Sequence, residues 1–229
     1  MGSEWSKLAE KGKDAQTIKN RVLNPKLLSL IKAYAPPRST VFDYGCRWGE
    51  FAQTLSDNGF SVEAFDDSDE MIQLARQQYS GPRFYTKQEF NALLPHKKQG
   101  YDFIVCNLVL CILKKEEQNI LISNVKDLVK QHGPIFLSFC HPCFDYITDG
   151  LVSKRLRPHI YNLKYDREFQ YRKVVHENNL EFSDYHRPLE YYIKLFIRHE
   201  LDIVHIAESD VLKTTFYPDF ILFVLEHRA

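Results

Sequence analysis

Short apolar, β-branched runs alternate along the chain with stretches in which apolar positions recur every three or four residues. The runs predict strands near residues 41–44, 61–65, 82–86, 101–106, 135–140, 202–207 and 220–225. The stretches predict helices near residues 51–58, 69–78, 115–131 and 188–198. This alternation is typical of a parallel sheet covered by helices on both faces. We therefore expect one α/β domain over residues 1–229.

Two segments depart from the alternation. Residues 1–33 have a helical pattern, which we expect to break at Asn24-Pro25 and to form an N-terminal helical cap. Residues 141–185 are irregular and rich in aromatic and basic side chains. Because long loops in compact domains are usually functional, we interpret this segment as a lid or acceptor-binding insertion. In the helix near 115–131, the expected buried stripe includes Ile120.

Composition narrows the class of function. The 30 Lys and Arg residues balance the 30 Asp and Glu residues, which argues against a general polyanion binder. No run approaches the about 18 apolar residues of a membrane span, so we expect a cytoplasmic protein without membrane contact. The five cysteines are thinly spread and fit reduced thiols. We expect no metal site, and we interpret Cys140-x-x-Cys143 as small residues at a strand end.

A glycine turn follows the first predicted strand, in the pattern Asp43-x-Gly45-x-x-x-Gly49. Such a turn lets the backbone at a helix N-terminus approach a ligand closely. Asp66 ends the second predicted strand, 21 residues after Gly45, close to the about 20 expected for a carboxylate that binds ribose hydroxyls. The dinucleotide fingerprint G-x-G-x-x-G is absent, so NAD is the weaker interpretation.

Three motifs together resemble the class I S-adenosylmethionine-dependent methyltransferases. Residues 41–49 are similar to the glycine-rich first motif of that family, 64–76 to its ribose-binding strand and helix, and 101–110 to its fourth-strand motif. Residues 139–144, 185–192 and 218–220 resemble a subgroup that acts on small molecules. The resemblance implies a Rossmann-like, seven-stranded, mostly parallel sheet with the last strand antiparallel.

The resemblance also implies a binding site for S-adenosylmethionine and for the product S-adenosylhomocysteine. Its methionine and ribose portion would be lined by Asp43, Gly45, Cys46 and Gly49, and its ribose would be bound by Asp66. The adenine would be bordered by Asp67 and Met71, with a further contact from Lys87, Gln88 or Glu89. Asn107 and Leu108 would lie beneath the sulfonium. The chain departs from the family by having Arg47 and Glu200 where glycine is usual.

The sequence therefore predicts methyl transfer to an oxygen or nitrogen atom of a small-molecule acceptor. His141 and His186 are candidates for a general base, because imidazole accepts protons near neutral pH. A hydrogen-bonded structural role is the alternative for each histidine.

Two other functions remain open. The basic and aromatic segment 154–173 is compatible with an RNA (tRNA) methyltransferase. Arg47 in the glycine turn is compatible with a non-catalytic or regulatory protein of the same fold. The oligomeric state and the identity of the acceptor do not follow from the sequence.

Overall fold

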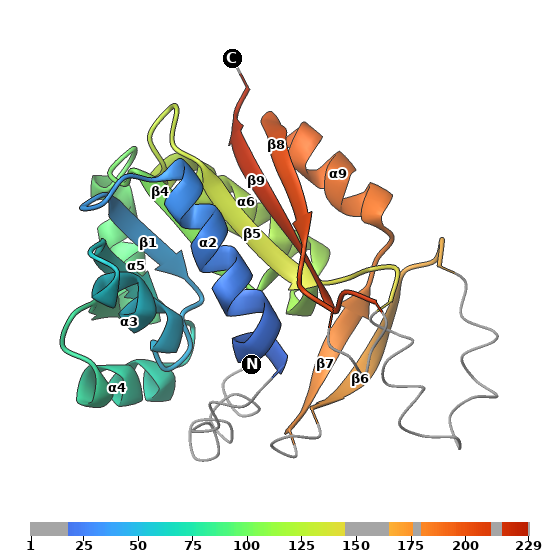
Figure 1. Ribbon diagram of the computed structural model, residues 1–229, viewed down its shortest axis with the longest axis horizontal. Coiled ribbons are helices and arrows are strands. Elements are labelled where there is room, and N and C mark those ends of the chain that lie inside the picture. Colours follow the sequence, from blue (N-terminus) through green and yellow to red (C-terminus); the bar gives the residue numbers. More distant parts are fainter. Residues whose placement is uncertain (1–17, 145–164, 176–179, 212–216, 229) are drawn as a thin grey trace.

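The computed structural model describes residues 18–144, 165–175, 180–211 and 217–228. Within these residues, seven strands form one sheet in the order β3-β2-β1-β4-β5-β9-β8 (Figure 1). The strands are β1 (Thr40–Tyr44), β2 (Ser61–Phe65), β3 (Arg83–Tyr85), β4 (Phe103–Asn107), β5 (Ile135–Cys140), β8 (Leu201–Glu208) and β9 (Phe220–His227). Strand β9 runs antiparallel to both of its neighbours, and the other strands are parallel to one another. The predicted Rossmann-like fold is confirmed.

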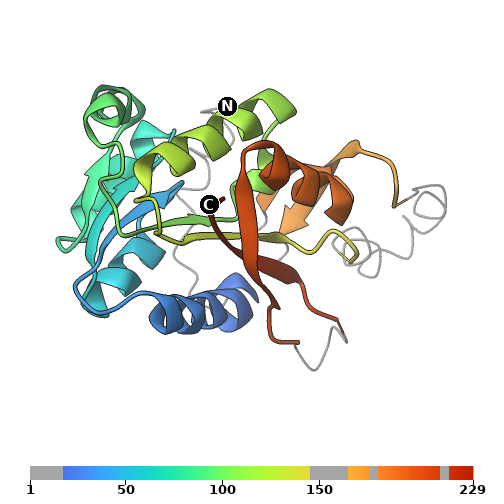
Figure 2. The same cartoon turned by 90° about the horizontal axis from the view of Figure 1, so that it is seen from above.

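Helices cover both faces of this sheet. They are η1 (Lys19–Leu23, a π-helical turn), α2 (Asn24–Tyr34), α3 (Glu50–Asp57), α4 (Asp69–Gln78), α5 (Lys87–Leu93), α6 (Lys115–Leu128) and α9 (Leu189–Arg198), with short 3₁₀ turns η2 (Leu94–His96) and η3 (Leu110–Ile112). Figure 2 shows α6 and α9 on one side of the sheet and α2 on the other. Among the described residues, no helix has the length and apolar character needed to cross a membrane.

Each face of the sheet has its own hydrophobic core. The core under η1, α2, α3 and α4 includes Leu23, Leu27, Ile31, Phe51, Leu55 and Ile72. The core under α5, α6 and α9 includes Phe90, Leu121, Val125, Tyr192, Leu195 and Phe196. Strand β4 supplies buried side chains to both cores, which explains its almost wholly apolar sequence.

Local sequence signals fix several helix starts. Ser68 caps α4, because its hydroxyl accepts a hydrogen bond from the Met71 N–H at 3.3 Å. Thr86 and Glu89 form a reciprocal capping box that starts α5. Helix α5 was not among the predicted helices, because it has seven residues and buries only Phe90, which is too short a pattern for a helical period.

The expectation for Ile120 was wrong. Its side chain is 60% exposed, whereas Gln118 on the same helix is fully buried. The Gln118 side chain donates to the Leu110 carbonyl at 2.6 Å and accepts from the Tyr191 hydroxyl at 2.6 Å. A polar side chain therefore takes the core position, since both of its polar ends find partners there.

The expected break at Asn24-Pro25 was also wrong. The π-helical turn η1 passes directly into α2 at Asn24, and Pro25 lies in the first turn of α2. The helix changes from π to α geometry directly before the proline, which has no N–H to donate, and the Asn24 N–H donates to the Lys19 carbonyl five residues back. Residues 1–17 of the predicted cap lie outside the described residues.

Part of the segment predicted to be irregular is regular. Strands β6 (Phe169–Val175) and β7 (Leu180–His186) pair antiparallel and form a separate two-stranded sheet (Figure 1). Residues 145–164 of the predicted lid lie outside the described residues. The hairpin contacts the main domain near η3, at the carboxyl edge of the sheet.

Gly49 gives a direct test of how tightly the first turn is packed. Its φ is +84°, and an added Cβ would lie 2.6 Å from the Phe84 ring. We expect Gly49→Ala to lower the free energy of unfolding by about 2–3 kcal/mol in urea denaturation. Gly59 has nearly the same φ, +88°, but no atom within 4 Å of the added Cβ. Gly59→Ala should therefore cost only the backbone strain, about 1 kcal/mol, and equal losses for the two variants would contradict the packing argument.

Candidate functional site

The turn after β1 is held against the end of β2. The Gly45 and Cys46 N–H groups both donate to the Phe65 carbonyl, at 2.8 and 2.9 Å. Gly45 has a φ of +86°, and a Cβ there would lie 2.4 Å from the Val109 side chain. The turn is thus fixed from two sides, and Gly45 meets both a conformational and a steric requirement.

Asp66 organises the rest of this turn. Its two carboxylate oxygens accept hydrogen bonds from the Arg47 N–H at 2.8 Å and from the Ser68 N–H at 3.0 Å. Burial raises the pKa of Asp66, and these two hydrogen bonds oppose the rise. Asp66 therefore joins the glycine turn to the start of α4, and its role at a ribose stays a prediction.

Asp43 lies at the centre of the site with an unsatisfied oxygen. Asp43 is 1% exposed, and its Oδ2 atom has no hydrogen-bond partner among the residues that the structure describes. Burial raises the pKa of Asp43 to about 7, with an opposing effect from the nearby Lys19 ammonium. A buried carboxylate oxygen without a donor is costly, which is typical of a group that binds a ligand.

The turn η1 covers the site. Lys19 Nζ lies 3.4 Å from Glu50 Oε2, and Asn20 Nδ2 donates to Glu50 Oε1 at 2.7 Å. Burial lowers the pKa of Lys19 to about 8, helped by the positive charge of Arg47 and opposed by Glu50. These contacts hold a partly buried cation near the Asp43 carboxylate.

Arg47 adopts the left-handed backbone conformation that glycine prefers, with a φ of +54°. Its guanidinium carbon lies 5.9 Å from the centre of the Trp48 ring. Burial lowers the pKa of Arg47, and Asp66 gives the largest opposing effect. The departure from glycine noted in the sequence therefore adds backbone strain and a second, partly buried cation to the site.

The cavity that remains is small. Its volume is about 20 Å³, and its lining consists of Lys19, Asp43, Gly45, Cys46, Arg47, Trp48, Glu50, Phe51 and Asn107. Ligand pockets for molecules of drug size usually measure about 300–1,000 Å³. Side chains of the chain itself thus fill most of the site.

Asn107 ends β4 and lines this cavity, and Leu108 follows it in the chain. Asn107 Oδ1 accepts from the Ser138 hydroxyl at 2.7 Å, and its Nδ2 donates to Asn24 Oδ1 at 3.1 Å. Leu108 has a φ of +62°, which is uncommon for a branched side chain. Helix α2 and strand β5 therefore fix the orientation of the Asn107 amide.

The residues predicted to border the adenine do not line the small cavity. Asp67 is exposed and pairs with Lys87 Nζ at 2.6 Å. Met71 is buried, 1% exposed, and does not line the small cavity. Glu89 caps α5 and pairs with Arg76 at 2.6 Å, so its carboxylate is already engaged. The roles of Asp67 and Met71 at adenine stay predictions.

Both candidate histidines are buried and hydrogen-bonded. His141 Nδ1 accepts from the Cys143 N–H at 3.2 Å, so the proton of a neutral ring is on Nε2, 3.0 Å from Glu208 Oε1. His186 Nε2 lies 3.0 Å from the Tyr165 carbonyl, and its ring stacks on Phe169. To act as a base through Nδ1, His141 has to give up the Cys143 contact. The catalytic role of each histidine stays a prediction.

Sequence reasoning missed Lys19, Trp48 and Glu50 as parts of the site. Trp48 and Glu50 lie within or next to the glycine turn, and that position was the available signal. Lys19 has no such signal, because only the tertiary position of η1 brings it to Asp43. The basic residues predicted over 154–164 lie outside the described residues.

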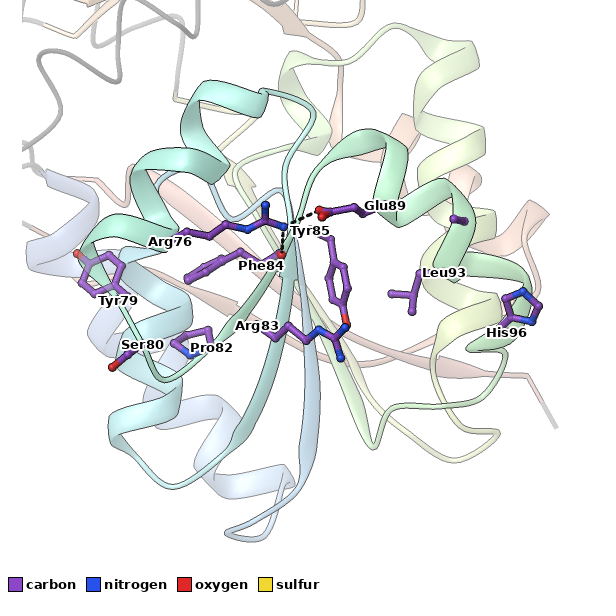
Figure 3. A pocket seen from close by; sticks show the side chains of 11 residues that line it. Arg76, Tyr79, Ser80, Pro82, Arg83, Phe84, Tyr85, Glu89, Leu93 and His96 are labelled. Carbon is purple, nitrogen blue, oxygen red and sulfur yellow. Dashed lines mark hydrogen bonds and ion pairs between the residues drawn. The ribbon is translucent and has the colours of Figure 1, made fainter.

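A larger cavity, about 670 Å³, lies at the β3 edge of the described structure (Figure 3). Arg76 there donates to the Phe84 carbonyl at 2.7 Å and pairs with Glu89, and Arg83 lies over the Tyr85 ring. This groove contains none of the residues of the glycine turn. Its size alone does not make it the functional site, because the unsatisfied carboxylate and the strained backbone both lie at the other cavity.

Comparison with known proteins agrees with the resemblance to methyltransferases noted in the sequence. A family model described as "Methyltransferase domain" matches residues 16–187. No curated protein sequence matches the chain.

Many solved structures share the fold. A SAM-dependent methyltransferase from Methanosarcina mazei has a TM-score of 0.66 and 19% identity, and the match covers 87% of this chain and 98% of that chain. The 1,6-didemethyltoxoflavin-N1-methyltransferase of Burkholderia thailandensis, with bound S-adenosylhomocysteine, has a TM-score of 0.66 and 13% identity over 99% of this chain and 87% of that chain. The magnesium protoporphyrin IX methyltransferase of Synechocystis, also with bound SAH, has a TM-score of 0.60 and 18% identity over 89% and 81% of the two chains.

The raised pKa of Asp43 predicts a pH-dependent cost to stability. Asp43 titrates near 7 in the folded chain and near 3.8 when unfolded, so the fold loses stability as pH rises from about 4 to 7. Asp43→Asn removes this cost, and we expect it to raise the free energy of unfolding by about 2–4 kcal/mol at pH 8 and by less at pH 5. Urea denaturation of both proteins at the two pH values measures the difference. The same gain at both pH values would contradict burial of an ionised Asp43.

Proposed function

The chain belongs to the family of methyltransferase domains, and from that premise we propose that it transfers the methyl group of S-adenosylmethionine to an oxygen or nitrogen atom of a small-molecule acceptor. S-adenosylmethionine is its cofactor and S-adenosylhomocysteine the product. Two proteins of the same fold are named for small-molecule acceptors, a toxoflavin precursor and magnesium protoporphyrin. Their names support the class of acceptor and not its identity.

The observation that carries this proposal is the unsatisfied Oδ2 of Asp43 at the end of β1. The cofactor carries an ammonium group on its methionine portion, which supplies the donors that this oxygen lacks. The Asp66 oxygens have lone pairs beyond those used by Arg47 and Ser68, and these accept ribose hydroxyls. The donor and acceptor set of the site therefore fits this cofactor.

Binding has to displace side chains, because the present cavity holds about 20 Å³. Lys19, Arg47 and Trp48 are the side chains that lie over Asp43 and the glycine turn. In our proposal the Arg47 guanidinium moves toward the methionine carboxylate, so that its charge is paired rather than repelled by the sulfonium. The strain at Arg47 fits a residue with two arrangements.

When bound, the cofactor supplies a methyl group on a positively charged sulfur that is a good leaving group. The chain then has to hold the acceptor in line at about 3 Å and exclude water. Asn107 lines the cavity and Leu108 follows it in the chain, and the hairpin β6–β7 contacts η3 at the same edge of the sheet. A general base is needed only for an acceptor that must lose a proton, and His141 and His186 remain the candidates.

Cofactor binding is tested by calorimetric titration of the full chain with S-adenosylmethionine and S-adenosylhomocysteine. We expect binding in the micromolar range, weakened about 10- to 100-fold in Asp66→Ala because charge-assisted hydrogen bonds are lost. Asp57→Ala is the matched control, since Asp57 lies at the end of α3 and bonds only locally to Gln53. Folded wild-type protein that binds neither compound would favour the non-catalytic alternative.

The base assignment is tested by release of S-adenosylhomocysteine with a panel of hydroxyl and amine acceptors. We expect His141→Gln or His186→Gln to lower turnover by about 100-fold, while the affinity for S-adenosylhomocysteine stays the same. Circular dichroism of each variant checks that it folds. Wild-type turnover in both variants would contradict the assignment of His141 or His186 as the general base.

A further inference from the structure

Two thiols and a carboxylate meet at the carboxyl edge of the sheet. Cys111 lies in η3, Cys140 ends β5, and Asp184 lies in β7 of the hairpin. One ligand atom from each, two sulfurs and a carboxylate oxygen, lie within 4.8 Å of one another. The sequence predicted no metal site here, because no second Cys-x-x-Cys motif or histidine pair completes a ligand set with Cys140 and Cys143. Asp184, which lies far away in the chain, reaches the cysteines through the hairpin.

The chemistry of this cluster is that of a binding site for a borderline metal ion. Thiolate sulfur and carboxylate oxygen are both common ligands of Zn²⁺. The hard cations Mg²⁺ and Ca²⁺ prefer oxygen ligands, so two sulfur ligands argue against either of them. Cys111 and Asp184 are buried, and Cys140 is partly exposed. Cys140 packs against the hydrophobic cores of both faces of the sheet.

Surrounding groups hold the carboxylate and balance the charge. The Asp184 carboxylate accepts hydrogen bonds from the Tyr185 N–H at 2.8 Å and from the Tyr171 hydroxyl at 3.4 Å. Carboxylates that bind metals are commonly held by such hydrogen bonds from neighbouring groups. The Arg47 guanidinium interacts electrostatically with both Cys111 and Cys140. Two thiolates and one carboxylate carry three negative charges, which a divalent cation and Arg47 together neutralise. This balance gives the unusual arginine of the glycine turn a physical role.

The cluster lies next to the predicted position of methyl transfer. In the sheet, Asn107 pairs with Ser138, and Cys140 lies two residues beyond Ser138 toward the carboxyl edge. Cys111 follows Asn107 by four residues. The cluster is therefore at the carboxyl ends of β4 and β5.

We propose that Cys111, Cys140 and Asp184 bind one Zn²⁺ ion and that the fourth position of its tetrahedron receives the methyl acceptor. Three protein ligands and one exchangeable position are typical of catalytic zinc, whereas structural zinc has four protein ligands. The described residues supply three. The ion binds without the cofactor, and its use in catalysis rests on the methyl transfer proposed above.

The chemical role is activation of the acceptor. A nitrogen or oxygen of the acceptor that binds the ion loses its proton to solvent at a lower pH than in water. Its lone pair then forms the bond to the methyl carbon. The carbon–sulfur bond of the sulfonium breaks, and its electron pair stays on the sulfur of S-adenosylhomocysteine.

The direct test is titration of the full chain, reduced and stripped of metal, with Zn²⁺ in competition with a chromophoric chelator. We expect one ion per chain. We expect Cys111→Ser, Cys140→Ser and Asp184→Asn each to weaken Zn²⁺ binding by more than about 100-fold. Loss of a residue that only supports a metal ligand typically weakens binding by about 10- to 100-fold. Cys143→Ser is the matched control, because its thiol lies three residues from Cys140 but contacts Tyr165 and is not part of the cluster.

Buried variants can fail to fold, so a second measurement uses the wild-type chain. With Co²⁺ in place of Zn²⁺, we expect intense charge-transfer absorption from thiolate to metal. The proposal is overturned if the reduced wild type takes up no Zn²⁺ at stoichiometric concentration, or if its Co²⁺ complex lacks this absorption. Equal loss of binding in Cys143→Ser would overturn it as well, because the ion would then be bound elsewhere.

Titration of the metal-free and the zinc-loaded protein with S-adenosylhomocysteine separates the two proposals. Cofactor binding without zinc binding would overturn the zinc site and leave methyl transfer standing. Zinc binding without cofactor binding would support the site and contradict the methyl transfer on which its catalytic role rests.

Discussion

The arrangement of the site depends on one buried carboxylate, that of Asp43, which lacks a hydrogen-bond donor to one of its two oxygens in the described part of the chain. Asp43 ends a strand that is covered on both faces, and its Oδ2 atom has no hydrogen-bond partner among the described residues. The fold compensates with charge, because Lys19 and Arg47 bring two cations to the same cavity. This compensation is incomplete, since both cations lose hydration there and their own pKa values fall. In the proposed function an ammonium group of the cofactor completes it, and so the free energy of unfolding of the chain and its affinity for the cofactor are linked.

The parallel arrangement of β1, β2 and β4 brings the residues around Asp43 together at one edge of the sheet. The register pairs Asp43 with Ala64 of β2 and with Val105 of β4, so the three strands end at one edge. The turn after β1, the carboxylate of Asp66 and the amide of Asn107 therefore converge. Strained backbone is concentrated at the same edge, where Arg47 and Leu108 both have positive φ. Backbone strain that is concentrated at one edge of a sheet is typical of functional sites.

The sequence predicted those features that depend on neighbours in the chain. Strand and helix positions follow from hydrophobic periodicity, and Gly45 and Asp66 follow from a turn motif with a fixed spacing. Contacts between distant segments left no such signal: Lys19 reaches Asp43 only through the position of η1, and Asp184 reaches the cysteines only through the hairpin. Ile120 was assigned to the wrong face because Gln118 satisfies its polar groups inside the core, which periodicity of apolar residues does not register.

The most direct test of the account is the pH dependence of the affinity for S-adenosylhomocysteine, measured by calorimetry on the wild type and on Asp43→Asn. With a pKa of about 7, the Asp43 carboxylate is about one-tenth ionised at pH 6 and about nine-tenths ionised at pH 8. Since the ammonium of the ligand needs the ionised form, the account predicts that wild-type affinity rises about 10-fold over this range and that the affinity of Asp43→Asn does not change. A wild-type affinity that is the same at both pH values would contradict the central role of Asp43.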